Sequence, residues 1–164
     1  MLKLTLAVLV ALSAVSTAIA DTKTTSFNVL LTITKACNFT TAASDVDFGS
    51  NLSTATSIEN AGTLRVTCTK GTPFTIGLGV GNGTGATTAA RKMKATTAGN
   101  TEEVPYVLYR DSARTLNWGD AASPDTLGSA GLGTEQAITV YGRVPSANFP
   151  ADSYKDIIVA TVTY

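Results

Sequence analysis

The sequence predicts an all-β protein with a sandwich fold, and two observations predict it. Apolar and polar side chains alternate along several short segments, which is the period of a strand and not of a helix. Glycine, proline, asparagine and aspartate separate these segments, as turn residues do between short strands. Many short strands with turn-rich connections favour a β-sandwich.

Residues 1–20 have the pattern of a secretory signal peptide. A basic start at Lys3 precedes an apolar run over residues 4–15, and small residues end the segment at Ala20. The segment is too short to cross a membrane as a mature helix, so we expect cleavage after Ala20 and export of the chain from Asp21 onward. A retained amphipathic helix or membrane anchor is the alternative.

The exported chain is expected to carry almost no net charge. Loss of Lys3 leaves 11 of the 12 basic residues against 12 acidic ones, a formal charge of −1. A nucleic-acid or anionic-membrane partner requires a basic excess on one face, so we expect neither. The remaining length suits one domain that can bury about two thirds of its unfolded surface.

The segment TSFNVLLTITKAC at residues 25–37 alternates strongly. Four large apolar side chains share one face of the extended chain: Phe27, Val29, Leu31 and Ile33. The other face is mostly polar, with Leu30 as the exception. A strand of this kind must join a sheet, which can belong to its own chain or to a neighbour.

Cys37 and Cys68 are the only cysteines, and an oxidising compartment favours a disulfide between them. In the chain-entropy model, closing a loop of about 30 residues contributes roughly 3.5 kcal/mol. A metal site is the weaker alternative, because two thiols without any histidine do not fill the usual set of four ligands. We expect a structural disulfide, no metal and no cofactor.

Five further segments have the pattern of strands: residues 63–69, 74–80, 104–110, 136–144 and 156–164. The first two are separated by a Gly-Thr-Pro turn and are expected to pair as an antiparallel hairpin. Residues 87–95 form the only stretch that could be helical. The stretch is short and lies between turn-rich segments, so we expect a loop or an edge strand.

The sequence lacks the residue patterns of the common enzyme active sites. Without histidine there is no Ser-His-Asp or Cys-His arrangement and no imidazole base. Asp45 and Asp47 could form a glycosidase pair, but solvated loop charges are the better interpretation. The glycine run at residues 77–85 matches neither the dinucleotide nor the Walker pattern. We expect no enzymatic activity and no catalytic residue.

Arg110 and Asp111 follow a predicted strand and could form a binding site. We expect instead that they form an ion pair that fixes the end of the strand. Trp118, in the sequence NWGD, is expected to pack over an edge of the sandwich.

The last predicted strand places four side chains on one face: Ile158, Ala160, Val162 and Tyr164. The sequence then stops. We expect a sandwich that lacks the strand beside this one, which the alternating segment of a neighbouring subunit could supply.

Several segments resemble the spore coat protein U domain family, the secreted subunits of archaic chaperone-usher pili in Gram-negative bacteria. They are YRDSARTLNWGD at 109–120, YGRVPSANFPADSYKD at 141–156 and VATVTY at 159–164. Cys37 after an alternating strand, the pair Phe48-Gly49 and the VTC ending at Cys68 fit the same pattern. The similarity covers essentially the whole mature chain.

The resemblance implies an incomplete immunoglobulin-like sandwich that lacks its last strand. It divides the chain into a signal peptide at 1–20, a donor strand running into the first strand at 21–36, and a pilin sandwich at 37–164. A periplasmic chaperone would face the last strand at Ile158, Ala160, Val162 and Tyr164. An outer-membrane usher would then exchange the chaperone for the donor strand of the next subunit, anchored by Phe27, Val29, Leu31 and Ile33.

The implied function is that of a structural pilus subunit that serves surface adhesion and biofilm formation. Its partners would be identical or related subunits, the chaperone and the usher, with no nucleic acid and no metal. The chain would pass through the periplasm to a pilus on the cell surface. A secreted binding module and a spore or cell coat protein are the alternatives, and a secreted hydrolase is opposed by the missing histidines.

Overall fold

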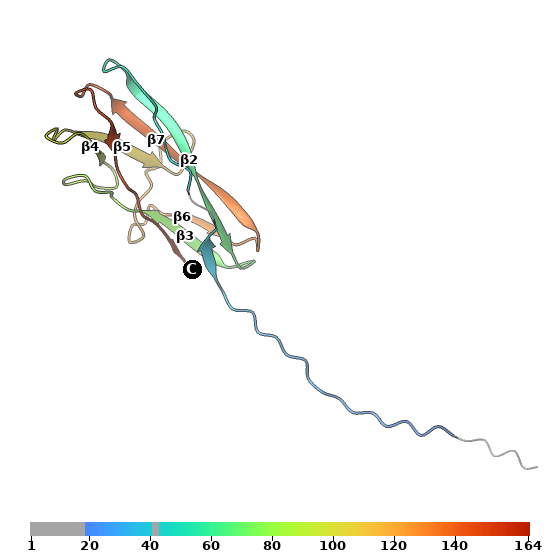
Figure 1. The fold of residues 1–164 in the computed structure, drawn as a ribbon. Helices are drawn as coiled ribbons and strands as arrows, with labels where there is room; N and C mark the ends of the chain where they lie inside the picture. The colour runs from blue at the N-terminus through green and yellow to red at the C-terminus, as the bar shows by residue number, and fades with distance from the viewer. Residues whose placement is uncertain (1–18, 41–42) are drawn as a thin grey trace, which may run out of the picture. The chain divides into compact units, whose positions relative to one another are not determined.

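The computed structural model describes residues 19–40 and 43–164, so most of the predicted signal peptide lies outside the described residues. Within the described residues the chain forms nine strands and no helix (Figure 1). The strands are β1 (Cys37–Phe39), β2 (Thr56–Cys68), β3 (Pro73–Leu78), β4 (Arg91–Ala95), β5 (Glu103–Tyr109), β6 (Leu127–Ala130), β7 (Glu135–Ser146), β8 (Tyr154–Lys155) and β9 (Ala160–Thr163). None of the described residues belongs to a helix long and apolar enough to cross a membrane.

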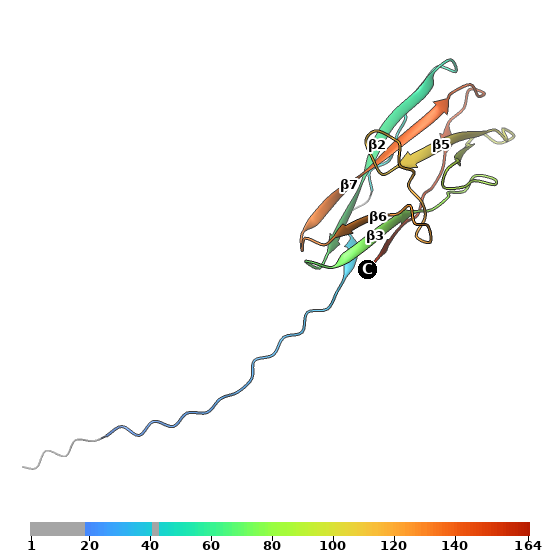
Figure 2. The ribbon, with the colours of Figure 1, turned by 180° about the vertical axis from the view of Figure 1, so that it is seen from behind.

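The strands form two antiparallel sheets, which Figures 1 and 2 show from opposite sides. The larger sheet has the order β1-β2-β7-β5-β4-β8, and the smaller sheet has the order β6-β3-β9. β2 and β7 form the longest ladder, which runs from the pair Thr56 and Ser146 to the pair Thr67 and Glu135. The pair of β2 and β7 is therefore the main strand pair of the larger sheet.

The hydrophobic core lies between the two sheets and follows the predicted alternation. Every second residue of the central strands is buried: Leu64, Val66 and Cys68 in β2, Phe74, Ile76 and Leu78 in β3, Val104, Tyr106 and Leu108 in β5, and Val140 and Val144 in β7. The period of two therefore identified the buried faces of residues 63–69 and 74–80 correctly except at Val80, which is 38% exposed.

The predicted hairpin between residues 63–69 and 74–80 is wrong. β2 pairs with β1 and β7, whereas β3 pairs with β6 and β9 in the other sheet. The connection crosses from one sheet to the other, and its amides donate to Ala36 and Gly131 (N–H of Thr69 and Gly71, 2.9 and 2.8 Å). The two apolar faces meet across the core and do not lie side by side in one sheet.

The last predicted strand, 156–164, is shorter than expected, because within it only β9 forms a strand, and β8 ends just before it. β8 pairs with β4 in the larger sheet, and β9 pairs with β3 in the smaller one. The residues between them, 156–159, carry the chain from one sheet to the other. Residues 87–95 include β4, a strand as expected, but it lies between β5 and β8 and is not at an edge.

Two further expectations need correction. Trp118 does not cover an edge, because it is completely buried and its Nε1–H donates to the carbonyl oxygen of Ile76 at 2.8 Å. Arg110 does not pair with Asp111. It lies 3.7 Å from a carboxylate oxygen of Asp125, while Asp111 accepts the backbone N–H of Leu116 at 2.8 Å and closes its own loop.

Candidate functional site

An open groove of about 560 Å³ lies between two segments of the sandwich. One wall consists of residues 43–48, and the other consists of residues 153–156 together with Ile158. Core side chains form the floor: Leu64, Leu78, Met93, Tyr106, Leu108 and Val140. The floor therefore consists of hydrophobic-core side chains, of which all but Met93 are at most 8% exposed.

The groove continues into a second hollow of about 820 Å³. Residues 46–53 and 149–154 line this hollow on its two sides. Val46, Phe48, Met93 and Tyr154 line both hollows, so the two share a boundary and form one elongated depression. Such a depression has the form needed to hold an extended segment of chain.

The first wall rests on two glycines of the larger sheet. A β-carbon at Gly62 would lie 2.5 Å from the carbonyl oxygen of Ser44, and one at Gly142 would lie 2.6 Å from Cγ1 of Val46. The backbone N–H of Ser44 donates to the carbonyl oxygen of Thr63 at 2.9 Å, which fastens the wall to β2. The absence of two side chains thus lets this segment approach the inner face of the sheet closely.

The second wall is held by polar contacts at both ends. Asp156 accepts hydrogen bonds from the backbone N–H of Asn82 and from the hydroxyl of Tyr106, both at 2.7 Å. Asp152 accepts from the side chains of Asn100 at 2.8 Å and Thr97 at 2.9 Å. The hydrogen bond from Asn100, with that from Thr97, lowers the pKa of Asp152 although partial burial opposes it.

A buried arginine, Arg91, lies near Asp156 of this wall. The side chain of Arg91 is fully buried and donates to four backbone carbonyl oxygens at 2.6 to 2.8 Å: those of Leu78, Gly79, Thr88 and Trp118. Burial lowers its pKa, while the nearby Tyr106 and Asp156 oppose that change. Burial and the carboxylate of Asp156 raise the pKa of Tyr106, so its hydroxyl remains a donor.

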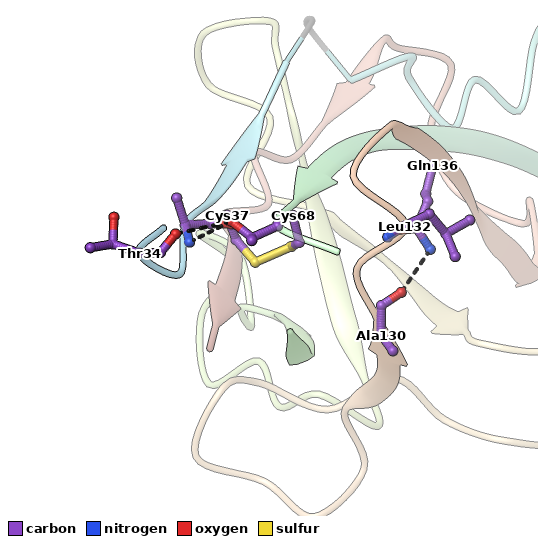
Figure 3. The surroundings of a disulfide bond; sticks show 8 residues. Thr34, Cys37, Cys68, Ala130, Leu132 and Gln136 are labelled. Carbon is purple, nitrogen blue, oxygen red and sulfur yellow. Dashed lines mark hydrogen bonds between the residues drawn. A yellow bond between two sulfur atoms is a disulfide. The ribbon is translucent and has the colours of Figure 1, made fainter. Parts of the chain in front are cut away.

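The predicted disulfide joins Cys37 to Cys68 and links β1 to the end of β2 (Figure 3). The two residues also face one another in the strand pairing. Next to them, the backbone N–H of Ala36 donates to Oγ1 of Thr69 at 3.1 Å. The disulfide therefore fixes the point at which the N-terminal segment enters the sandwich.

Residues 23–161 match the Spore Coat Protein U domain. The chain belongs to this family. It is 31% identical to Protein U of Myxococcus xanthus, over 93% of the present chain and 91% of that protein. The identification agrees with the resemblance seen in the sequence.

A solved structure has the same fold as this Spore Coat Protein U domain. It is a chain of the CsuC–CsuE chaperone–tip adhesion subunit pre-assembly complex from the archaic chaperone-usher Csu pili of Acinetobacter baumannii. The likeness has a TM-score of 0.56 at 19% identity, over 81% of the present chain and 40% of that chain. The predicted fold class, an incomplete immunoglobulin-like sandwich, is confirmed.

The predicted face of the last strand lies beside the groove of the Spore Coat Protein U domain. Ile158 lines the groove, and Ala160 and Val162 of β9 pack half-buried against the core. Tyr164 follows β9 and is half exposed. Among the described residues β9 pairs only with β3, which leaves the other edge of β9 without a partner strand.

The predicted donor residues lie in a segment without strand structure. Residues 19–36 contain no strand, and the sandwich unit begins at Ile33. Phe27, Val29 and Leu31 are more than four-fifths exposed, and Ile33 is three-quarters exposed. Exposure of four large apolar side chains on one face is unusual for a finished surface.

Sequence reasoning missed the groove walls and Arg91. A lysine- and arginine-containing stretch ordinarily indicates a solvated face, and nothing in its pattern distinguished Arg91 from its neighbours. Gly62 and Gly142 interrupt otherwise apolar inward positions of two strands. That interruption was the one available signal of a close backbone approach.

Proposed function

We propose that this protein is a structural subunit of a chaperone-usher pilus and that its subunits join by donor-strand exchange. One observation carries the proposal: the chain has an open groove lined by core side chains and by Ile158, two residues before β9, which has one edge without a partner strand among the described residues, and also an exposed alternating segment of the kind that fills such a groove. Family membership supports it independently.

In this proposal, residues 21–36 of one subunit add as a strand along β9 of the next. Backbone hydrogen bonds to the strand edge supply affinity, and side chains that enter the groove supply specificity. Phe27, Val29, Leu31 and Ile33 would enter the groove, where burying each large apolar side chain contributes about 1.5 to 3 kcal/mol. The added strand would cover both the open core and the free edge.

An unfilled groove exposes apolar surface and unpaired backbone groups, which promotes aggregation. A periplasmic chaperone that occupies the groove through Ile158, Ala160, Val162 and Tyr164 would prevent this until an outer-membrane usher delivers the next subunit. Export through residues 1–20 and display in a surface pilus complete the proposed route. Surface adhesion and biofilm formation are the proposed roles of that pilus.

A coat assembled from the same subunits is the second candidate, which the family's description favours. It would use the same strand exchange and differ in where the polymer is deposited. Electron microscopy of the producing cell distinguishes the two, since a pilus gives projecting fibres and a coat gives a continuous layer.

The test of strand exchange is a denaturing gel, with and without boiling, of the protein released from a co-expressed periplasmic chaperone. We expect a ladder of SDS-resistant multimers that collapses to monomer on heating and disappears when residues 21–34 are deleted. Leu31→Asp should abolish the ladder without preventing export. Thr32→Asp is the matched control, because it places the same charge on the opposite face of the same segment.

A stable monomer whose association is unchanged by the deletion would contradict the proposal. Normal polymerisation of the Leu31→Asp variant would contradict the assignment of the anchors. A stable monomer would instead favour a secreted binding module that needs no neighbouring subunit.

A further inference from the structure

The donor segment and the last strand each expose apolar side chains on the face that the groove does not use. In the donor segment this side chain is Leu30, which is 87% exposed. Near β9 the side chains are Ile157 and Val159, which are 60% and 67% exposed. The fold of the subunit explains none of the three.

The alternation of an extended chain places all three on the outer surface of the assembled sheet. Ile158, Ala160 and Val162 pack against the core, so Ile157 and Val159 point away from it, and Thr161 and Thr163 follow them on that side. In the donor segment the outer positions besides Leu30 are Ser26, Asn28, Thr32 and Thr34. The outer face of each segment is therefore polar except at one place, which is Leu30 in the donor segment and the pair Ile157 and Val159 near β9.

We propose that Leu30 of one subunit packs against Ile157 and Val159 of the next subunit and fixes the register of the donor strand. The inference rests on the proposed strand exchange, which makes the donor segment the neighbour of β9. Neighbouring strands lie about 4.8 Å apart, and side chains directly or diagonally opposite one another are within contact distance. Ile157 and Val159 are two positions apart, so one leucine can touch both.

The groove face opposes a slip of two residues less strongly than a slip of one residue. A slip of one residue turns every anchor outward and is strongly opposed. A slip of two residues keeps the same face inward and fills three of the four anchor positions with another apolar side chain, while Thr25 or Lys35 takes the fourth. In one direction the same slip moves Leu30 beside Lys155 or Thr161, so the outer contact disfavours it; in the other direction Leu30 stays opposite one of its two apolar partners.

The test measures dissociation of a synthetic peptide of residues 21–36 from the full-length protein. The acceptor carries Leu31→Asp, so that its own segment does not compete, and is refolded with labelled peptide. We expect the Leu30→Thr peptide to dissociate about two- to fivefold faster than the natural peptide. On an acceptor that also carries Ile157→Thr and Val159→Thr, the two peptides should dissociate at the same rate.

An Asn28→Thr peptide is the matched control, because it changes an outer position away from the proposed contact and should leave the rate unchanged. Equal rates for the Leu30→Thr and natural peptides on the first acceptor would overturn the inference. So would an undiminished difference on the second acceptor. A Leu31→Asp peptide that binds as tightly as the natural one would overturn the proposed function as well, which separates the two failures.

Discussion

The hydroxyl of Tyr106 donates a 2.7 Å hydrogen bond to Oδ2 of Asp156, and this contact joins the floor of the groove to one of its walls. Tyr106 belongs to β5 in the larger sheet, whereas Asp156 lies where the chain leaves that sheet for β9. The same carboxylate accepts the backbone N–H of Asn82. The position of the second wall therefore depends on a polar contact between elements that are about 50 residues apart in sequence.

Removing this contact should loosen the wall. We expect Tyr106→Phe to lower the free energy of unfolding by about 1.5 to 3 kcal/mol, because it removes a hydrogen bond to a charged group. Urea denaturation of the protein refolded with donor peptide measures the change. Tyr141→Phe is the control, since among the described residues its hydroxyl has no hydrogen bond, and an equal loss in both variants would contradict the assigned role of Tyr106.

The first wall should be sensitive to a single methyl group. Gly62→Ala would place a β-carbon 2.5 Å from the carbonyl oxygen of Ser44, so the wall must move. We expect a loss of about 1 to 3 kcal/mol in stability and faster dissociation of the donor peptide. Gly128→Ala in β6 has nothing within 4 Å of the added carbon and should be neutral or slightly stabilising.

Replacing both cysteines should cost stability without changing the fold. The disulfide closes a loop with a sequence separation of 31 residues, for which the chain-entropy model gives about 3.5 kcal/mol. We expect this loss for the variant that combines Cys37→Ser and Cys68→Ser, measured by urea denaturation. Reductant should lower the stability of the natural protein by a similar amount and leave the stability of the double variant unchanged. If reductant also lowered the stability of the double variant, its effect would have a cause other than the disulfide.

Acid should weaken the second wall through Asp152. The pKa of this carboxylate is lowered in the folded protein, so its contribution to stability is complete above the ordinary value of 3.8 and is lost as the pH falls through the lowered pKa. We expect Asp152→Asn to be less stable than the natural protein near about pH 6, with the difference shrinking towards about pH 2. Urea midpoints across this range measure it.

The control for the acid experiment is Asp45→Asn. It changes the net charge by the same amount, and among the described residues the Asp45 side chain accepts no hydrogen bond. This variant should follow the natural protein across the whole range. A difference between Asp152→Asn and the natural protein that does not depend on pH would show that the charge of Asp152 is not responsible.

Alternation in the sequence predicted which face of each strand is buried, but not which strands pair. Leu64 and Ile76 are both buried as expected, yet their strands belong to different sheets. A period of two reports only that one side of a strand avoids water. The partner is decided by the connection at residues 69–72, whose hydrogen bonds to distant residues are not visible in a local pattern.

The candidate site was predictable only in its apolar parts. Ile158 was recognised because its neighbours alternate with it. Arg91 and Trp118 were not, because the groups that satisfy them are backbone carbonyls brought close by the fold, such as those of Ile76 and Leu78. Composition does not reveal such acceptors, since every residue carries one.

The disulfide also determines how the proposed polymer would carry mechanical load. Tension applied to residues 21–36 reaches the sandwich at Cys37, in a strand of three residues that could peel from its neighbour one hydrogen bond at a time. The covalent bond passes this tension directly to Cys68 at the end of β2, which is 13 residues long and paired with β7 along most of its length. A pull on the fibre would then pass from Cys68 through residues 69–72 to β3, whose ladder with β9 lies next to the donor strand held by the same subunit.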